Sequence, residues 1–246
     1  MIKEAIDRVL ALATPNIHTV GDLEWTDKTL NLIYPPTPKA VHCSTLQGLV
    51  DLFQEDLDDV KPEQVLVHIT SPTTVEIISK DADDYGRRRV WAEAAYPECK
   101  PFPFGSWMEP EAFIISAQMQ FQRVKVEGDD GAFTKDLDYV LGIASKISAD
   151  HTTENVDDGF AQRVAVKQGV TLKTETILKP MVNLAPYRTF AEIDQVLSQF
   201  VFRARVQNGG AHLALFEGDG GRWKLAAVAA IKAWLEPKFS TVSIIS

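Results

Sequence analysis

Residues 200–217 read FVFRARVQNGGAHLALFE, and this stretch decides the fold class. It contains two segments of strand-forming residues, 200–206 and 211–217, joined by Gln207-Asn208-Gly209-Gly210. Asn and Gly tolerate the positive backbone φ angles that tight turns between antiparallel strands require. The stretch therefore predicts a β-hairpin.

Other parts of the chain repeat this organisation. Pairs of strand-like segments separated by two or three turn-forming residues lie at 65–70 with 74–79 and at 161–167 with 170–178. Residues 87–95 add a third predicted strand to the first pair. Strands that are grouped as hairpins, and do not alternate one by one with helices, indicate an α+β fold and argue against a parallel βαβ sheet.

Helices are predicted from apolar residues that recur every three or four positions. The segments with this spacing are 1–15, 44–58, 109–122, 134–147, a short helix starting at 189, and 222–236. Ser44 with Gln47, and Thr189 with Glu192, have the spacing of capping boxes, in which side chains satisfy backbone N–H groups of the first turn. We therefore expect antiparallel, hairpin-built sheets packed with about six helices.

A polar, glycine-bearing stretch at residues 127–131, with the sequence EGDDG, separates two of the predicted helices. Such a stretch is typical of a loop between structural regions. We place a boundary there, which gives an N-terminal α+β region at 1–127 and a C-terminal α+β region at 128–246. One continuous domain is the alternative.

The composition of the chain indicates the cellular compartment in which the protein is expected. The 246 residues include only two cysteines, Cys43 and Cys99, which is too few for a disulfide framework and favours reduced thiols in the cytoplasm. Charged residues interrupt the apolar stripe of the first 15 residues, so we interpret that segment as an amphipathic helix and not as a signal peptide. No run of about 18 apolar residues is present, so no membrane association is expected.

Catalytic and metal-binding motifs are absent from the sequence. It contains no HExxH, no CxxC, no G-x-S-x-G and no P-loop, so we predict no metal, no cofactor and no catalytic residue. His42 and Cys43 with His68 could be assembled by folding into a metal site. Cys43, at the entrance to a predicted capped helix, could also be a reactive thiol, and a buried, inert Cys43 is the competing interpretation. An enzyme whose site is assembled from scattered residues is a further hypothesis.

Charge is distributed unevenly along the chain. The net charge is −9, which argues against nonspecific coating of nucleic acid, yet residues 199–246 carry six Lys/Arg against three Asp/Glu. Strand alternation places Arg203 and Arg205 on one face of segment 200–206, and Arg222 and Lys224 follow the second strand of the hairpin. These four residues are the predicted anion-binding face, and pairing with acidic residues of the N-terminal segment is the alternative.

Residues 217–221, EGDGG, connect a predicted strand to the last predicted helix. A glycine-bearing loop before a helix can present backbone N–H groups to a phosphate. It can equally be a tight corner in which Asp219 caps the helix. Both interpretations stay open at this point.

Several segments together resemble an uncharacterised protein family of tailed phages and prophages. They are Phe104-Gly105-Ser106 with residues 111–115, Asp157-Asp158-Gly159, and the most specific stretch, 184–221. The family has no assigned catalytic residues. The resemblance implies a non-enzymatic accessory protein of the host cytoplasm, encoded among early or replication-associated phage genes.

Within that stretch, Pro186 fixes the chain before Tyr187 and Arg188. Tyr and Arg are frequent interface anchors, so both are candidate binding residues, although they could instead attach the following segment to the sheet. We expect the protein to bind a macromolecular partner or to self-assemble, with a homo-oligomer formed through the doubly apolar segment 222–236. The alternative is a nucleic-acid or nucleotide binder, acting in replication or recombination or sequestering a host nucleotide signal.

Overall fold

The computed structural model of the protein describes residues 2–13, 16–26, 34–55, 60–96, 101–123, 135–149, 152–157, 162–168, 171–207 and 210–246. Their contacts form two compact units, which are described separately. The smaller unit contains Met1–Lys39 and Ala82–Arg89, and the larger one contains Ala40–Asp81 and Val90–Ser246.

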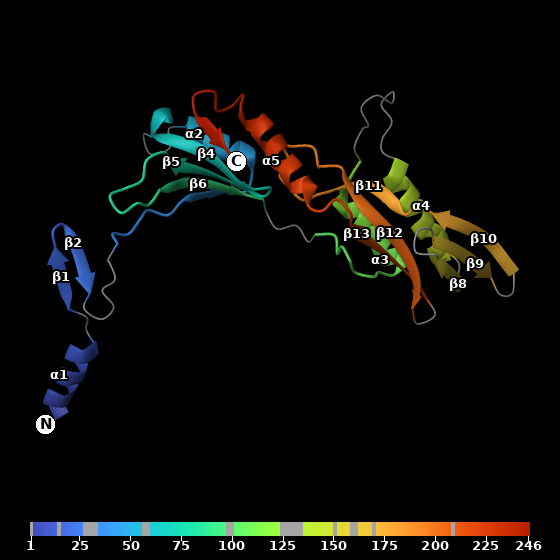
Figure 1. Ribbon diagram of the computed structural model, residues 1–246, viewed down its shortest axis with the longest axis horizontal. Helices are drawn as coiled ribbons and strands as arrows, with labels where there is room; N and C mark the ends of the chain where they lie inside the picture. Colours follow the sequence, from blue (N-terminus) through green and yellow to red (C-terminus); the bar gives the residue numbers. More distant parts are fainter. Residues whose placement is uncertain are drawn as a thin grey trace. The chain divides into compact units, whose positions relative to one another are not determined.

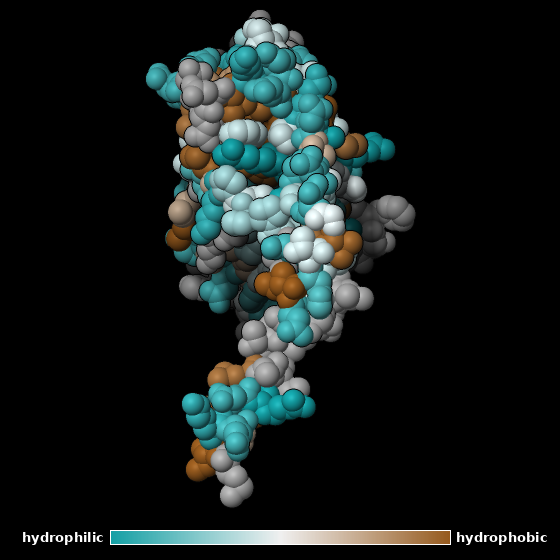
Figure 2. Space-filling view, turned by 90° about the vertical axis from the view of Figure 1, so that its left-hand side faces the viewer, coloured by the Kyte–Doolittle hydropathy of each residue, from teal (hydrophilic) through white to brown (hydrophobic). Residues whose placement is uncertain are grey.

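The smaller unit contains one helix and one hairpin. Helix α1 spans Ile2–Ala13, and strands β1 (Ile17–Val20) and β2 (Leu23–Thr26) pair in antiparallel fashion. Gly21 makes the turn between them with a φ of 64°, a conformation that favours glycine. In the first part of α1, Ile2, Ile6, Val9 and Leu10 are exposed, and Figure 2 shows hydrophobic residues beside hydrophilic ones on this part of the chain.

The larger unit begins with a five-stranded sheet in the order β14-β4-β5-β6-β3 (Figure 1). Its strands are β3 (Val41–Cys43), β4 (Val65–Ser71), β5 (Thr74–Ser79), β6 (Val90–Ala95) and β14 (Ser243–Ile245). The central pairs are antiparallel, as predicted. The two outer strands pair in parallel with their neighbours, which hairpin signals do not anticipate.

Helices α2 (Leu46–Gln54) and α5 (Arg222–Leu235) contribute to the core on one face of this sheet. Alternate residues of β4, namely Val65, Val67 and Ile69, are buried against them, as the two-residue period of a strand requires. A short 3-10 turn, Pro62–Gln64, leads into β4. Phe190 and Ile193, from a segment far along the chain, complete this core.

The second core lies on a four-stranded sheet in the order β13-β12-β11-β7. Its strands are β7 (Phe121–Gln122), β11 (Met181–Pro186), β12 (Ser198–Gln207) and β13 (Gly210–Glu217), and helices α3 (Pro110–Gln120) and α4 (Lys135–Ala149) pack on its inner face. A third, antiparallel sheet contains β8 (Thr152–Asp157), β9 (Gln162–Gln168) and β10 (Thr171–Leu178).

The α+β fold with mostly antiparallel sheets is therefore confirmed. The structure describes five α-helices in the ranges given above, against about six predicted. The domain boundary predicted at residues 127–128 lies outside the described residues and stays a prediction. Each of the two cores contains side chains from both sides of that position.

The helix predicted from Thr189 does not form, and the capping-box side chains have other partners. The Thr189 hydroxyl donates to the carbonyl oxygen of Pro72. Glu192 Oε1 accepts from the backbone N–H of Gln47, 3.2 Å away, and so satisfies the first turn of α2 from outside. Glu192 therefore caps α2, and not the helix that was predicted to begin at Thr189.

The N-cap of α2 differs from the prediction by one residue. Thr45 has extended backbone angles, and its Oγ1 accepts from the N–H of Gly48 at 3.0 Å. Ser44, the predicted cap, precedes it and is exposed. None of the described helices combines the length and the apolar character needed to cross a membrane.

The structure assigns different roles to the hydroxyl groups of Ser44 and Thr45, because only that of Thr45 caps α2. We expect Thr45→Ala to lower the free energy of unfolding by about 1 kcal/mol, because a backbone donor of α2 loses its acceptor. The matched control, Ser44→Ala, should change it by less than about 0.5 kcal/mol, as for an ordinary surface position. Urea denaturation of both variants measures the difference, and a larger effect at Ser44 would contradict the cap.

Candidate functional site

The predicted site residues lie on or beside the hairpin β12–β13. Its register pairs Phe202 with Leu215 and Arg203 with Ala214, and it ends at the pair of Gln207 with Gly210. Phe202 and Leu215 are fully buried on the inner face, so Arg203 lies on the outer face, as strand alternation predicted. The turn residues Asn208 and Gly209 are outside the described residues.

A cation–π contact marks the outer face of the sheet. The Arg205 guanidinium carbon lies 4.2 Å from the centroid of the Trp107 ring, and the Trp107 and Phe216 rings meet edge to face at 5.8 Å. Arg205 also donates to Gln207 Oε1. All three side chains are partly exposed, so part of this cluster of a planar cation and two aromatic rings is open to solvent, although Arg205 Nε is buried.

Trp107 reaches the outer face because its segment extends the sheet past β13. Gly105 N–H donates to Leu215 O at 2.8 Å, and Met108 and Leu213 exchange both backbone hydrogen bonds. Arg205 lies on the other side of β13, so its side chain crosses that strand to stack on the indole. We call Trp107, Arg203, Arg205, His212 and Phe216 the outer-face cluster.

Arg222 and Lys224 do not join this cluster. Both are exposed on the first turn of α5, which follows the far end of β13. Arg205 pairs with His212, and Glu217 at the α5 end is five residues further along β13. At about 3.4 Å per residue, that end of the strand is ~17 Å away. The four predicted basic residues therefore form two groups.

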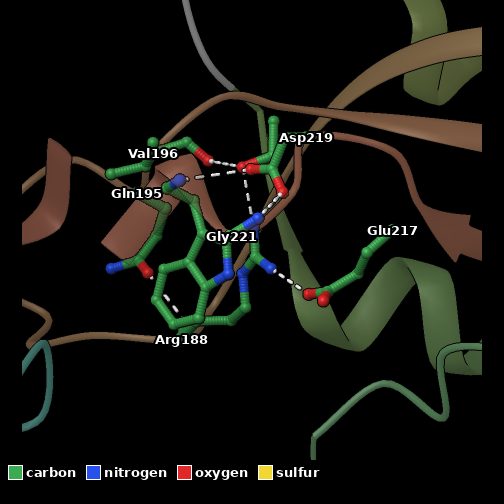
Figure 3. Close-up of polar contacts among 8 residues, drawn as sticks. Arg188, Gln195, Val196, Glu217, Asp219 and Gly221 are labelled. Carbon is green, nitrogen blue, oxygen red and sulfur yellow. Dashed lines mark hydrogen bonds and ion pairs between the residues drawn. The ribbon is translucent and has the colours of Figure 1, made fainter. Parts of the chain in front are cut away.

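Arg188 is engaged inside the chain (Figure 3). Its guanidinium donates to Glu217 Oε1 at 2.6 Å and to Ser198 Oγ at 2.7 Å, and its carbon lies 4.0 Å from the Trp223 ring centroid. It also lies 5.5 Å from the ring centroid of Phe200. Only 10% of the side chain is exposed. Of the two interpretations of Arg188, attachment of its segment to the sheet is the one that these contacts support.

Arg188 is a largely buried cation that forms an ion pair with Glu217. Burial lowers the pKa of its guanidinium, and the nearby carboxylates of Glu217 and Asp219 oppose that effect. The Glu217 side chain is 43% exposed, so it remains hydrated in part while Arg188 does not. Removing Arg188 would leave Glu217 able to take up water, whereas removing Glu217 would leave a buried charge with less compensation.

The glycine loop before α5 is a capped corner. Asp219 Oδ1 accepts from Gly221 N–H at 3.0 Å, and Oδ2 accepts from Trp223 N–H at 3.2 Å. Gly218 N–H donates to Gln199 O, and Arg222 N–H donates to Asp219 O. The chain's own carboxylate thus occupies the place that a phosphate would take, so of the two interpretations the corner is confirmed.

Gln195 organises the loop that contains Arg188. Its Oε1 accepts from the N–H groups of Arg188 at 2.9 Å and Thr189 at 3.3 Å, and its Nε2 donates to Phe190 O at 3.2 Å. Gln195 is buried, so these bonds replace water. Tyr187, the other predicted anchor, is 41% exposed and donates its backbone N–H to Gln120 O.

Cys43, His42 and His68, the residues considered for thiol or metal chemistry, do not form a common site in the structure. Cys43 is a free thiol whose pKa is raised by burial, which disfavours the nucleophilic thiolate. His42 and His68 lie on separate strands, 3.8 Å from Glu93 and 3.9 Å from Glu76. Within the described ranges, no group of three or more His, Cys, Asp or Glu side chains could hold a metal ion. Cys99 lies outside those ranges.

Comparisons with known proteins find no match to this chain among family models, curated proteins or solved structures. The resemblance to the phage and prophage family is therefore still a prediction.

The sequence pattern did not single out Trp107, Phe216 and His212, which belong to the outer-face cluster. Phe216 and His212 could have been found, because the register of the predicted hairpin places them opposite Val201 and Arg205. Trp107 carries no such signal, since its position depends on a contact between segments about a hundred residues apart in the chain.

The contacts of Arg188 predict a large effect on stability. We expect Arg188→Ala to lower the free energy of unfolding by about 2–4 kcal/mol, from the loss of charge-assisted hydrogen bonds and the stack on Trp223. Arg188→Lys should recover part of it, because it restores the charge but not the planar geometry. Arg222→Ala, an exposed cation nearby, is the control and should change stability by less than about 0.5 kcal/mol. Equal melting temperatures for the Arg188 and Arg222 variants would contradict this assignment.

Proposed function

We propose that the protein is a non-enzymatic accessory protein, phage- or prophage-encoded as its resemblance implies, that binds a macromolecular partner in the host cytoplasm. The binding surface is the outer-face cluster. The observation that carries the proposal is the stack of Arg205 on Trp107, with Phe216 against the indole edge. These side chains lie on the opposite face of the sheet from its core, and aromatic and Arg side chains are the groups that most often anchor interfaces.

The chemistry of the cluster favours a single-stranded nucleic acid as the partner. Unpaired bases stack on aromatic rings and on the planes of Arg guanidinium groups, and phosphates pair with Arg. The Trp107–Arg205 stack offers such a plane, and Arg203 and His212 flank it on the same face.

Charge alone does not carry this binding. The chain has a net charge of −9, and the cluster contributes two guanidinium groups. Two phosphate contacts to a single strand predict a salt slope of only about −1.4. Base stacking, at ~1–3 kcal/mol per base, must therefore supply most of the affinity.

The structure offers less support for self-association through α5. The buried residues of α5 are Ala227, Ile231 and Leu235, and Val228 and Trp234 also pack against the core. Trp223 lies beneath Arg188. Trp234 has the Lys238 ammonium 3.6 Å from its ring centroid. Both tryptophans of α5 thus have partners within the chain, and the homo-oligomer stays a prediction.

Binding of a fluorescently labelled 15-mer of thymidine, followed by anisotropy at several salt concentrations, tests the proposal. We expect Trp107→Ala and Arg205→Gln each to weaken binding by about 5- to 150-fold, the equivalent of one lost base stack. Arg205→Gln should also make the salt slope shallower by about 0.7.

The control is Arg222→Ala, which removes an exposed cation from the α5 end of the hairpin and should leave the affinity within about twofold. Thermal melts confirm that each variant is folded. An unmodified protein that fails to bind the oligonucleotide at low salt would contradict the nucleic-acid proposal. So would an Arg222→Ala variant as weak as Arg205→Gln.

A further inference from the structure

A cleft of about 600 Å³ lies in the smaller unit, outside the site already described. One wall is the β1–β2 hairpin with Asp22 and Glu24, and another is the stretch Tyr34-Pro35-Pro36. Tyr85, from the second segment of this unit, also lines the cleft. The volume is within the range of ligand-binding pockets.

The aromatic wall of the cleft is held in place by Arg87. Its guanidinium carbon lies 5.2 Å from the Tyr34 ring centroid and 5.1 Å from that of Tyr85, and Nη1 donates to Pro35 O at 3.1 Å. The two tyrosine rings meet edge to face at 5.7 Å. Tyr34 is nevertheless 52% exposed, so one aromatic surface stays open to a ligand.

The charge that faces the cleft is negative. Arg87 is neutralised by Asp83, with Nη2 and Oδ2 2.8 Å apart, and the backbone N–H of Arg87 donates to the same carboxylate at 2.8 Å. Asp22 and Glu24 are then the charged residues of the lining. Both are exposed at the hairpin, one in its turn and one on β2.

We propose that this cleft binds an extended basic segment of a partner protein, with an arginine or lysine side chain at Asp22 and Glu24 and the backbone of the segment along Tyr34 and the prolines. Tyrosine- and proline-lined grooves suit extended peptides, since such peptides pack apolar side chains on aromatic rings at low entropic cost. The two carboxylates set the sign of the charge that the segment must carry.

Isothermal titration with three synthetic peptides tests this. They are acetyl-PPRPPR-amide, its neutral counterpart with Gln at both Arg positions, and its acidic counterpart with Glu. We expect the Arg peptide to bind about 2- to 30-fold more tightly than the Gln peptide, as for two exposed ion pairs, and the Glu peptide to bind most weakly. The preference should decrease with added salt.

The double variant Asp22→Asn with Glu24→Gln should bind the Arg and Gln peptides equally. Its matched control, Glu4→Gln with Asp7→Asn, removes the same charge from α1 of the same unit and should keep the preference. Three outcomes would each overturn the proposal. They are equal affinity for the three peptides, an equal loss of the preference for the Arg peptide in the control variant, and binding of argininamide as tight as that of the Arg peptide. Oligonucleotide binding involves the other unit, so the two proposals fail independently.

Discussion

One guanidinium group connects the parts of the larger unit. The segment after β11 and the corner before α5 both pass from the four-stranded sheet to the core of the five-stranded sheet, and Arg188 lies where they meet. It stacks on Trp223 of α5, donates to Glu217 at the end of β13, and donates to Ser198 at the start of β12. A buried Arg needs planar, charge-assisted partners to offset its desolvation, and this junction supplies them.

That constraint explains why Arg188, beside the hairpin, and Arg205, on it, have different roles. Arg188 is directed toward the inner side, where its donors have acceptors within the chain and little surface is left for a partner. Arg205 is on the outer face, where its stack on Trp107 is partly exposed. Asp219 closes the corner by capping α5, so the glycine loop is a structural connection. The outer face of β12 and β13 is therefore where we propose that the oligonucleotide binds.

The elements that sequence reasoning predicted well are those fixed by local chemistry. The hairpin at 200–217 follows from its turn residues, and alternation alone placed Arg205 on the outer face. The failures involve contacts between distant segments. Glu192 had the spacing of a capping-box residue, yet it caps α2 because the fold brings Gln47 within reach. The predicted four-residue basic face is divided into two groups, because Arg222 follows the far end of β13, five residues beyond the partner of Arg205.

Arg188 and Trp223 pack within the chain, while Arg205 and Trp107 lie at its surface, where we propose that the oligonucleotide binds. The most direct test follows the indole N–H signals of Trp107 and Trp223 in a ¹H–¹⁵N spectrum during titration with a thymidine 15-mer, with each signal assigned by a Trp→Phe variant. We expect the Trp107 signal to shift in proportion to bound oligonucleotide and the Trp223 signal to stay in place. A shift confined to Trp223, with Trp107 unchanged, would contradict the proposal.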